Sequence, residues 1–512
     1  MNRIIIVRKD SYHDSVLLMR ISREVKSLPG VVDAVIAMAT PQNRSILYDM
    51  GFSNPLLDTV NSNDLVIAVQ TENIDQVKIE EMIDDLLKKK SDGEEIRHKP
   101  FTLSAAIREA PEANLVLISV PGEYATREAR MALSKGLHVM IFSDNVSLED
   151  EVSLKKSAIQ QGLLCMGPDC GTAIINGKPL AFANIIRHGS IGIVGASGTG
   201  IQEVTCCIHR LGGGITQAIG TGGRDLSDEV KGTMTIMGIQ ALAEDQETEV
   251  IVVVSKPPSR RVAEKVTQLL KTTGKKCIVH FVGEPLRNET TEDNLIFTSS
   301  LAVTAEEACR SAGIPIPTNL GLEHDTALVE ELSELISPGA RVLGLFCGGT
   351  TAHEALSLLT RHGFEVLSNL FKDGPLRIDG TKHESAHVIL DLGSDEYTAG
   401  RPHPMIDPIL RNERLLLEMQ DPRVGLLLFD LILGYGSHDN PASILAEGVR
   451  QAREVAREHE REIVAVASIT GTPSDPQGFD TQRRYLEDAG VVVMPDNFRA
   501  ASLVAAILRR IV

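Results

Sequence analysis

Short apolar runs alternate with amphipathic stretches along most of the chain. The apolar runs are bounded by glycine, proline or polar residues, as buried strands are. They cover residues 2–8, 31–38, 65–70, 114–120, 139–142, 191–194, 215–219, 249–254, 277–281, 342–346, 388–392 and 424–429. Many of the stretches between them place apolar residues at helical spacing. Alternating strands and helices indicate parallel sheets, so the pattern predicts an α/β protein.

The alternation divides the chain into several segments, and a length of 512 residues also favours several domains. Residues 1–96 form a small N-terminal α/β segment, for which we expect a ferredoxin-like arrangement followed by a polar linker. Two further strand-and-helix segments follow at 97–188 and 189–315. A proline-containing linker at 316–338 precedes a last α/β segment at 339–512.

Composition excludes several classes of protein. The net charge is -18 and no long Lys/Arg cluster appears, which argues against nucleic-acid binding. The seven cysteines are scattered and form no C-x-x-C pair, which favours a reducing compartment over a disulfide scaffold or a structural zinc. The first residues lack the apolar core of a signal peptide, and no apolar run approaches the roughly 18 residues of a membrane span. We therefore expect a cytoplasmic protein without a bound metal.

The stretch Ile191–Leu211 is the most informative in the chain. A buried strand runs directly into a glycine-rich turn, and a helix with Ile201, Val204 and Ile208 on one face follows. Free backbone N–H groups and the positive dipole end at such a helix start favour an anion. Thr199 with Gln202 fits a capping box. The candidate phosphate-binding residues are Ser197, Gly198, Thr199 and Gly200. A plain strand-to-helix turn without a ligand is the alternative.

The same design recurs twice in the last segment. Gly348, Gly349 and Thr350 precede a helix for which Thr351 and Glu354 suggest a capping box, and we take the first three as further phosphate-binding candidates. Gly434 and Gly436 approach a helix with Asn440 as the expected N-cap and Pro441 at its first position. Three glycine-rich approaches to helix starts favour a phosphate-type ligand more than one would.

Three polar loops supply the remaining candidates. The first carries Gly167, Pro168, Asp169 and Cys170, and the second carries Gly222, Gly223 and Arg224. The third, Gly400–Pro408, contains Arg401, His403 and Asp407 between prolines.

Each candidate has a chemical rationale and an ordinary alternative. Arg224 either pairs with a substrate oxyanion or lies at the surface. His403 either titrates near neutral pH as an acid or base, or is structural. Cys170 and Cys347 would need a nearby base to act as nucleophiles. His403 and Asp407 are too few ligands for a metal.

From about Leu115 to Cys309 the chain resembles the alpha subunit of succinyl-CoA synthetase. The motifs MGPDCGT, IGIVGASGTG and GTGGRD carry this resemblance. The segment containing LLLFDLILGYG is similar to the carboxyl-terminal domain of the beta subunit. The whole chain is identified as a member of the FdrA family by FSDNVSLEDE, MGPDCGTAIING, VSKPP, GRPHPMIDP and LEDAGVVV. The resemblance implies Rossmann-like and flavodoxin-like domains and two facing helix N-termini around a phosphate.

The chain also departs from succinyl-CoA synthetase. Its Gly-His-Ala-Gly phosphohistidine loop is absent, since the chain reads VGEPLRNETTEDN after Phe281. Ser255-Lys256 stands where the synthetase has an acidic residue supporting that histidine. The ATP-grasp domain and the glycine-rich CoA segment are not visible.

The FdrA resemblance implies a subunit of an oxamate-type carbamoyltransferase of allantoin or purine catabolism. It would use carbamoyl phosphate or another acyl phosphate, with CoA as a further candidate ligand. It would act on a small molecule with partner subunits, and could associate with copies of itself. The alternatives are an ADP-forming acyl-CoA ligase that needs an ATP-grasp partner, and a non-catalytic ligand-binding or assembly subunit. Under the first hypothesis we expect the loop 400–408 to face the Ser197 turn.

Overall fold

The computed structural model divides the chain into two compact units. One contains Met1–Ala106 with Glu396–Pro402, and the other contains Ile107–Asp395 with His403–Val512. The structure describes residues 2–11, 13, 15–26, 28–40, 43–44, 47–48, 50–52, 54–72, 74, 76–88, 100–283, 291–292, 294–316, 326–371, 373–378, 386–398 and 401–511. Among the helices of these residues, none combines the length and the apolar character that crossing a bilayer requires.

The N-terminal unit is a small α/β domain, as expected. Its three-stranded sheet has the order β1-β3-β2 and is antiparallel. Alternating residues of β3 feed two cores, because Ile67 and Val69 pack towards the helices while Val66 and Ala68 pack towards Phe52 on the other face. The elements are β1 (Asn2–Arg8), α1 (Ser15–Lys26), β2 (Val31–Met38), η1 (Pro55–Asp58), β3 (Leu65–Thr71) and α3 (Gln76–Lys88).

The second unit begins with a small parallel sheet of order β4-β5-β6. Helix α5 buries a row of small residues, Ala125, Ala129 and Ala132, and packs against β5 and α6. The elements of this region are α4 (Leu103–Glu109), which straddles the boundary between the units, β4 (Leu115–Ile118), α5 (Gly122–Ser134), β5 (His138–Ile141), α6 (Leu148–Gln160) and β6 (Cys165–Met166).

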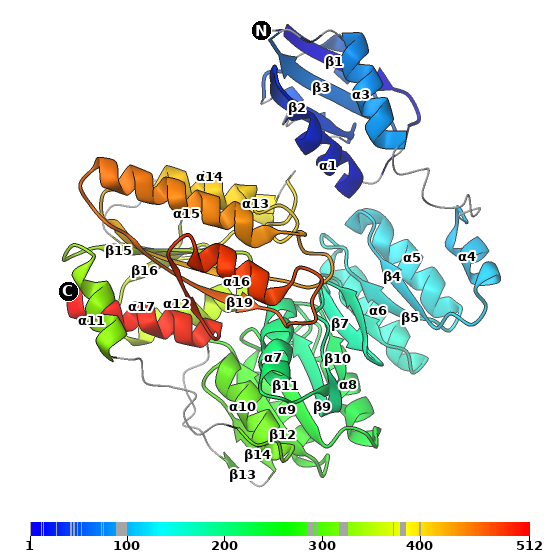
Figure 1. Ribbon diagram of the computed structural model, residues 1–512. Helices are drawn as coiled ribbons and strands as arrows, with labels where there is room; N and C mark the ends of the chain where they lie inside the picture. Colours follow the sequence, from blue (N-terminus) through cyan, green and yellow to red (C-terminus); the bar gives the residue numbers. More distant parts are fainter. Residues whose placement is uncertain are drawn as a thin grey trace. The chain divides into compact units, whose positions relative to one another are not determined.

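An eight-stranded sheet follows, with the order β13-β14-β12-β11-β9-β10-β7-β8. Helices α7 and α10 cover one face and α8 and α9 the other, so β9, β11 and β12 are apolar on both sides (Figure 1). The hairpin β7–β8 joins this sheet, although the sequence pattern places it before the boundary at residue 188. The elements are β7 (Thr172–Ile175), β8 (Lys178–Ala181), β9 (His188–Ala196), α7 (Gly198–Arg210), β10 (Ile215–Gly220), α8 (Thr233–Glu244), β11 (Val250–Ser255), α9 (Arg260–Lys271), β12 (Lys276–Phe281), β13 (Thr291–Glu292), β14 (Leu295–Phe297) and α10 (Leu301–Ser311).

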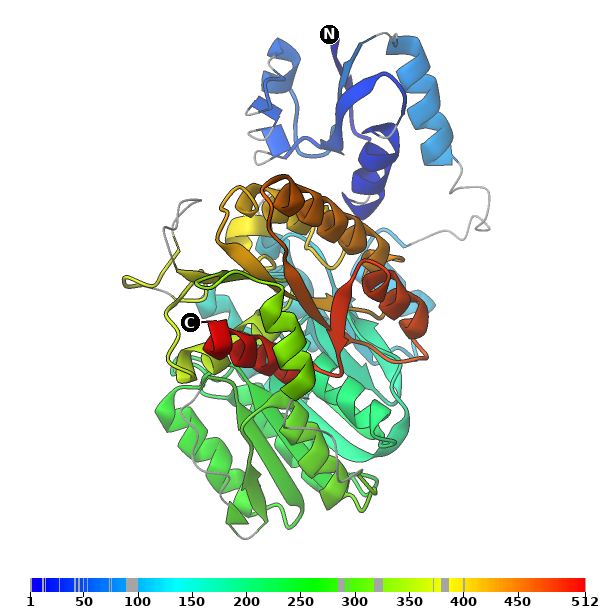
Figure 2. The ribbon, with the colours of Figure 1, turned by 60° about the vertical axis from the view of Figure 1, so that its left-hand side comes forward.

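The last sheet is six-stranded and entirely parallel, with the order β16-β17-β15-β18-β19-β20. Helices α11, α12 and α17 cover one face; α17 and α11 lie side by side in both ribbon views (Figure 2). The elements are α11 (Thr326–Glu334), β15 (Arg341–Phe346), α12 (Gly349–Arg361), β16 (Val366–Ser368), β17 (His387–Asp391), α13 (Asp395–Thr398), α14 (Ile409–Glu418), β18 (Val424–Ile432), α15 (Pro441–Glu458), β19 (Val464–Thr470), α16 (Phe479–Glu487), β20 (Val491–Met494) and α17 (Asn497–Ile511).

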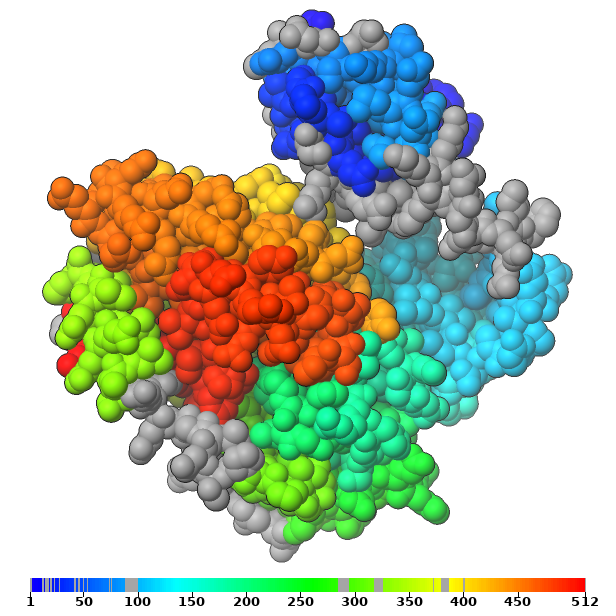
Figure 3. Space-filling view, in the orientation of Figure 1, coloured from blue at the N-terminus to red at the C-terminus, as the bar shows by residue number. Residues whose placement is uncertain are grey.

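The eight-stranded and six-stranded parts pack directly against each other. Helix α7 contacts α12 and α10 contacts α17, and the space-filling view shows the orange and red C-terminal atoms abutting the green atoms of the eight-stranded part (Figure 3). Polar groups are buried in this junction: Asn184 donates to Asp475 over 2.8 Å, and Arg499 forms a salt bridge of 3.0 Å with Glu306. The expected facing of these two parts is therefore present.

Candidate functional site

Two helix N-termini meet where these parts join. The hydroxyls of Ser197 and Thr350 lie 2.6 Å apart, and the backbone N–H of Thr350 donates to the Thr199 hydroxyl over 3.3 Å. Both helices start where a parallel strand ends, β9 for α7 and β15 for α12. The structure thus brings together the two glycine-rich turns that the sequence identified separately.

Glycine is required where the turns approach each other. A Cβ atom on Gly200 would lie 3.1 Å from Cγ2 of Thr350, and one on Gly348 would lie 3.0 Å from Cγ2 of Thr199. A side chain at either position would force the facing threonine methyl to shift by a few tenths of an ångström.

The N-cap of α7 is Ser197, whose hydroxyl accepts from the N–H of Gly200 over 3.1 Å. The expected capping box of Thr199 and Gln202 is therefore wrong by two positions, because the helix already begins at Gly198. The Thr199 hydroxyl instead accepts a hydrogen bond from the N–H of Thr350 in α12.

Asp430 at the end of β18 holds the N-terminus of α12, a role that the sequence did not indicate. Its carboxylate accepts from the N–H groups of Cys347 and Gly348 over 2.8 Å and 2.9 Å, and from the Thr351 hydroxyl over 2.7 Å. Arg411 forms a buried salt bridge of 3.1 Å with it. The protein's own carboxylate therefore occupies part of the anion-binding capacity of this helix end.

The expected capping box of Thr351 and Glu354 is also wrong. The Glu354 carboxyl accepts from the N–H of Leu301 over 2.7 Å and from the Asn497 side chain over 2.7 Å, so it reaches away from its own helix start. The predicted N-cap of α15, Asn440, holds that position, although its side chain makes no capping hydrogen bond.

Lys256 and Asp391 lie beside the first residue of α12. A Cβ atom on Gly349 would be 2.6 Å from Oδ2 of Asp391 and 3.3 Å from Nζ of Lys256. Lys256 follows β11 and is exposed, whereas Asp391 ends β17 and is buried. The sequence singled out Lys256 only as a departure from the synthetase, because the spacing of one lysine along a chain does not reveal its neighbours in space.

Two carboxyl groups near Lys256 have raised pKa values. Burial raises the pKa of Asp391 to about 6, although Lys256 and the N–H of Gly393 counteract it. Asp169 reaches solvent, yet the protein packed around it raises the pKa of its carboxyl to about 6, against the effect of Lys256. Both groups therefore change ionisation near pH 6, within the range that acid–base chemistry uses.

The loops of Gly167–Cys170 and Gly222–Arg224 pack together. Gly222 has a φ of +87°, and a Cβ atom on it would lie 2.3 Å from the carbonyl oxygen of Pro168. A Cβ atom on Gly223 would lie 3.2 Å from Oδ2 of Asp169. These glycines allow the two loops to touch, which explains their presence without a ligand.

The predicted thiol candidates are buried. Burial raises the pKa of the Cys170 thiol to about 12, and burial raises the pKa of Cys347 well above its usual value. Neither side chain is a thiolate at neutral pH, so neither carries nucleophilic chemistry in this conformation.

Arg224 is engaged by the protein itself. Its Nε donates to Glu151 over 2.9 Å and its guanidinium also donates to the carbonyl of Val146 over 2.8 Å. Glu151 in turn pairs with the buried Lys155, which also binds Asp225 at 2.8 Å. The guanidinium that was a candidate to bind a substrate oxyanion thus holds α6 against the loop after β10.

The loop 400–408 divides between the two units. Gly400 lies outside the described residues, and Arg401 is exposed in the segment Glu396–Pro402 of the N-terminal unit. Its place beside the Ser197 turn stays a prediction. Asp407 accepts from the N–H of Ile409 over 3.1 Å, which supports the start of α14.

His403 lies in the second unit, against Phe182 at a ring separation of 5.7 Å. Its Nδ1 accepts from the N–H of Met405 over 3.2 Å, so Nε2 carries the proton in the neutral ring. Burial lowers the pKa of His403 to about 4. The expectation of a group titrating near neutral pH is therefore corrected: at that pH the ring is neutral and offers a hydrogen-bond donor at Nε2.

Gly434 and Gly436 form part of the junction between the two large sheets. Their φ angles are +107° and +79°, and Cβ atoms on them would meet the carbonyl of Ala183 and the ring of Phe182. Between them, the N–H of Tyr435 donates to the carbonyl of Ala183 over 2.8 Å. This contact accounts for both glycines structurally.

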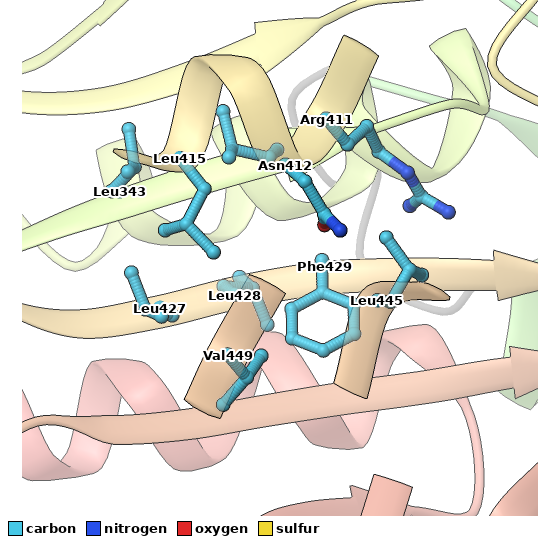
Figure 4. A pocket seen from close by; sticks show the side chains of 10 residues that line it. Leu343, Arg411, Asn412, Leu415, Leu427, Leu428, Phe429, Leu445 and Val449 are labelled. Carbon is cyan, nitrogen blue, oxygen red and sulfur yellow. The ribbon is translucent and has the colours of Figure 1, made fainter. Parts of the chain in front are cut away.

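A separate apolar pocket lies between α14, α15 and the sheet (Figure 4). Its volume of about 20 Å³ is close to that of a single water, and leucines with Phe429 and Val449 line it. Arg411 lies at its edge, with the guanidinium directed away from Leu415, Leu427 and Leu428. We regard this pocket as part of the core.

Three family models match parts of the chain. The description "AllF, heavy metal-associated domain" matches residues 1–100, "CoA binding domain" matches 186–283 and "CoA-ligase" matches 345–507. The two large sheets thus correspond to separate CoA-related families.

The N-terminal unit lacks thiolate ligands for a heavy metal. Soft metals are held by thiolates, and no cysteine precedes Cys165. No group of three or more His, Cys, Asp or Glu side chains that could hold a metal occurs among the residues that the structure describes.

Two relatives and one solved structure are similar to the chain. It is 40% identical over 495 residues to "Uncharacterized protein YahF" of Escherichia coli K12, covering 96% of this chain and 95% of the relative. It is 28% identical over 157 residues to succinate–CoA ligase [ADP-forming] subunit alpha 2 of Archaeoglobus fulgidus, covering 30% of this chain and 53% of that subunit. The dinucleotide-forming acetyl-coenzyme A synthetase 1 of Ca. Korarchaeum cryptofilum aligns at 15% identity with a TM-score of 0.28, over 78% of this chain and 83% of that one.

These likenesses differ in what they establish. At a TM-score of 0.28 the structural alignment carries no argument. The chain spans about half the length of the ligase alpha subunits, 53% and 56% for two of them. The match to YahF extends along nearly the whole of both chains. The chain therefore belongs to the family of YahF, an FdrA-like family with succinyl-CoA synthetase-like CoA-binding and CoA-ligase domains.

Proposed function

We propose that the chain is a subunit of a transferase that handles carbamoyl phosphate or a related acyl phosphate. The observation that carries this proposal is the meeting of α7 and α12, whose N-termini touch through Ser197 and Thr350 with the ammonium of Lys256 beside them. Helix N-termini and a lysine favour a phosphate group. The ligase-type domains support a group-transfer reaction with partner subunits.

The transfer needs little from the protein beyond positioning. A nucleophilic atom of the acceptor attacks the carbamoyl carbon, the bond from that carbon to the phosphate oxygen breaks, and phosphate leaves with the acceptor's proton. Developing negative charge on the leaving phosphate would be stabilised by the N–H groups of the two helix starts and by Lys256. No phosphorylated histidine is required for this reaction.

An ADP-forming acyl-CoA ligase is the second candidate. The CoA-binding and CoA-ligase models favour it. The CoA-binding model covers residues 186–283, which contain the glycine-rich turn Gly195–Gly200, so this candidate places CoA at the turn that the transferase assigns to phosphate. The chain lacks the Gly-His-Ala-Gly sequence after β12. A ligase would therefore need an ATP-grasp partner and a different phosphate carrier.

Phosphate release from carbamoyl phosphate tests the proposal. We expect the purified chain, together with the proteins encoded beside it, to release phosphate when an amide or amino acceptor is added. The matched comparison is ATP, CoA and a carboxylic acid. Phosphate release in the carbamoyl phosphate assay, with no reaction of ATP and CoA, supports the transferase. Formation of ADP and acyl-CoA, with no phosphate release from carbamoyl phosphate, would overturn the transferase in favour of the ligase.

Autophosphorylation separates the two candidates a second time. We expect no acid-labile phosphate on this chain after incubation with radiolabelled ATP, because the histidine loop is absent from the sequence. A label that disappears when one histidine is substituted would contradict this expectation. His353, on α12 beside Gly283, would be the first histidine to substitute.

A further inference from the structure

An unpaired lysine lies at the positive end of α12. Nζ of Lys256 is 3.3 Å from the position of a Cβ atom on Gly349, the first residue of this helix. Among the residues that the structure describes, the ammonium makes no hydrogen bond or salt bridge. A cation next to a helix N-terminus is unfavourable, since both carry positive charge. The counter-charges that the protein supplies here are Asp430, which binds the N–H groups of Cys347 and Gly348, and Asp391 and Asp169, which interact with Lys256 without forming a salt bridge to it.

Asp391 offers a hydrogen-bond acceptor at the same place. Its Oδ1 accepts from the N–H of Gly393 over 3.0 Å, while Oδ2 lies 2.6 Å from the Cβ position of Gly349. No described residue donates a hydrogen bond to Oδ2. An exposed ammonium that forms no salt bridge and a carboxylate oxygen that accepts no hydrogen bond from the described residues thus both lie beside one helix start.

The other charged groups near Lys256 and Asp391 leave both available to a ligand. Asp391 interacts with Lys256, Asp430 and Asp169. Asp430 is already occupied by Arg411, the Thr351 hydroxyl and two backbone N–H groups. Asp169 interacts with Lys256, Arg224, Asp395 and Asp144, and Arg224 is held by Glu151. Lys256 therefore remains the cation available to a ligand within this described group of charges.

We infer that Lys256 binds the anionic oxygens of the ligand and that Asp391 accepts an N–H group of the same ligand. The site would then take a small anion that also carries an amide or amino nitrogen. This inference rests on the proposed function and deepens it, because it names Asp391 as the residue that distinguishes carbamoyl phosphate from other acyl phosphates. An acetyl group would present a methyl or a carbonyl oxygen to Asp391, which can donate no hydrogen bond.

Sulfate tests the role of Lys256, because sulfate does not change its charge between pH 5 and pH 8. We expect Lys256→Met to weaken sulfate binding about 10- to 100-fold in calorimetry, the range for losing a charged hydrogen bond. Lys256→Arg should retain most of the binding. Lys156→Met removes an exposed lysine of α6 and serves as the matched control with unchanged affinity.

The pH dependence tests Asp391. Its pKa of about 6 means that the carboxyl becomes negative as pH rises through 6, so sulfate should bind more weakly at pH 7.5 than at pH 5. Asp391→Asn should reduce this dependence, and the part that remains belongs to Asp169, whose pKa is also raised to about 6. The same substitution should reduce the preference for carbamoyl phosphate over acetyl phosphate about 10-fold or more, since the amide presents a competing donor.

The outcomes separate the inference from the proposed function. If the wild-type chain binds carbamoyl phosphate but Lys256→Met binds it equally well, the inference is overturned and the proposed function stands. If the preference for carbamoyl phosphate over acetyl phosphate is the same in Asp391→Asn as in the wild type, the proposed role of Asp391 is likewise overturned. If the wild type binds neither sulfate nor either acyl phosphate, the proposed function itself fails. Thermal melting of every variant shows whether a loss of binding reflects unfolding.

Discussion

Two buried glutamates connect the eight-stranded and six-stranded parts through similar contacts. Glu203 on α7 accepts from the N–H of Asn497 over 3.1 Å, and Glu354 on α12 accepts from the N–H of Leu301 over 2.7 Å. Each carboxyl therefore caps a helix of the other part. Burial raises the pKa of Glu354 to about 8, against the effect of its hydrogen bonds with Asn497 and Leu301.

The pKa of Glu354 predicts how stability depends on pH. Because the folded state raises this pKa, the protonated form favours folding at low pH, and that advantage is lost as pH rises from the unfolded value through about 8. We expect Glu354 to reduce the free energy of unfolding by about 2–3 kcal/mol between pH 6 and pH 9. Urea denaturation over this range should show the loss in the wild type and not in Glu354→Gln. Exposed Glu458→Gln is the control, and an equally steep loss in Glu354→Gln would contradict the assignment.

The contact between Ser197 and Thr350 predicts a measurable coupling. Thr350→Val keeps the shape of the side chain but leaves the buried Ser197 hydroxyl without its partner at 2.6 Å. We expect a cost of about 1–3 kcal/mol for the single change, and less than the sum of the two single costs for Ser197→Ala combined with Thr350→Val. A double-mutant cycle of unfolding free energies measures this, and additive costs would show that the two hydroxyls do not interact.

At the scale of the element, α12 is positioned by charge as well as by packing. Its apolar face lies in the core between the six-stranded sheet and α17, while Asp430 binds its N-terminal N–H groups. Arg411 from α14 forms a salt bridge with the same carboxylate. The direction of the α12 dipole towards α7 is therefore fixed by residues from β18 and α14, which lie far from it in sequence.

Asp430→Asn should test this anchoring. The amide directs an N–H donor at the backbone donors and leaves the buried Arg411 without a counter-charge, for which we expect a loss of about 3–5 kcal/mol in unfolding free energy. The exposed Asp439→Asn is the matched control and should change stability by less than about 0.5 kcal/mol. Chemical denaturation provides both values, and a near-neutral Asp430→Asn would mean that packing alone holds α12.

At the scale of the whole molecule, the second unit behaves as one folded body in its contacts. The sheets of order β13 to β8 and β16 to β20 are linked by Asn184 with Asp475, by Glu203 with Thr470 and by Arg499 with Glu306. These pairs are buried, so separating the two parts would leave charges and donors without partners. The proposed site lies at this junction and depends on it.

The seven cysteines report on the integrity of the whole fold. All of them are unpaired and buried, and burial raises the pKa of several of their thiols, including Cys165 and Cys309 to about 12. We expect fewer than one thiol per chain to react with a disulfide reagent in the native protein, and all seven to react in denaturant. Rapid native reaction of two or more thiols would contradict the burial of these side chains.

The sequence alone predicted the α/β class and most of the strands. Apolar runs such as 31–38 and 342–346 became β2 and β15. β15 is apolar throughout because it is buried on both faces of a parallel sheet, whereas β2 buries alternate residues in an antiparallel sheet. The same reasoning located both glycine-rich helix starts, since a strand that hands over to a helix in a tight turn needs glycine at close approaches. These properties are local, and local sequence determines them.

Tertiary structure decided what the local turns do. The sequence did not reveal that Asp430 caps α12, that Glu151 engages Arg224, or that burial lowers the pKa of His403 to about 4. Nor did it place Lys256 and Asp391 beside Gly349, because Asp391 lies 42 positions after Gly349 in the sequence and Lys256 lies 93 positions before it. Charges, hydrogen-bond partners and burial depend on which strand ends meet, and that meeting is set by the packing of two sheets rather than by spacing along the chain.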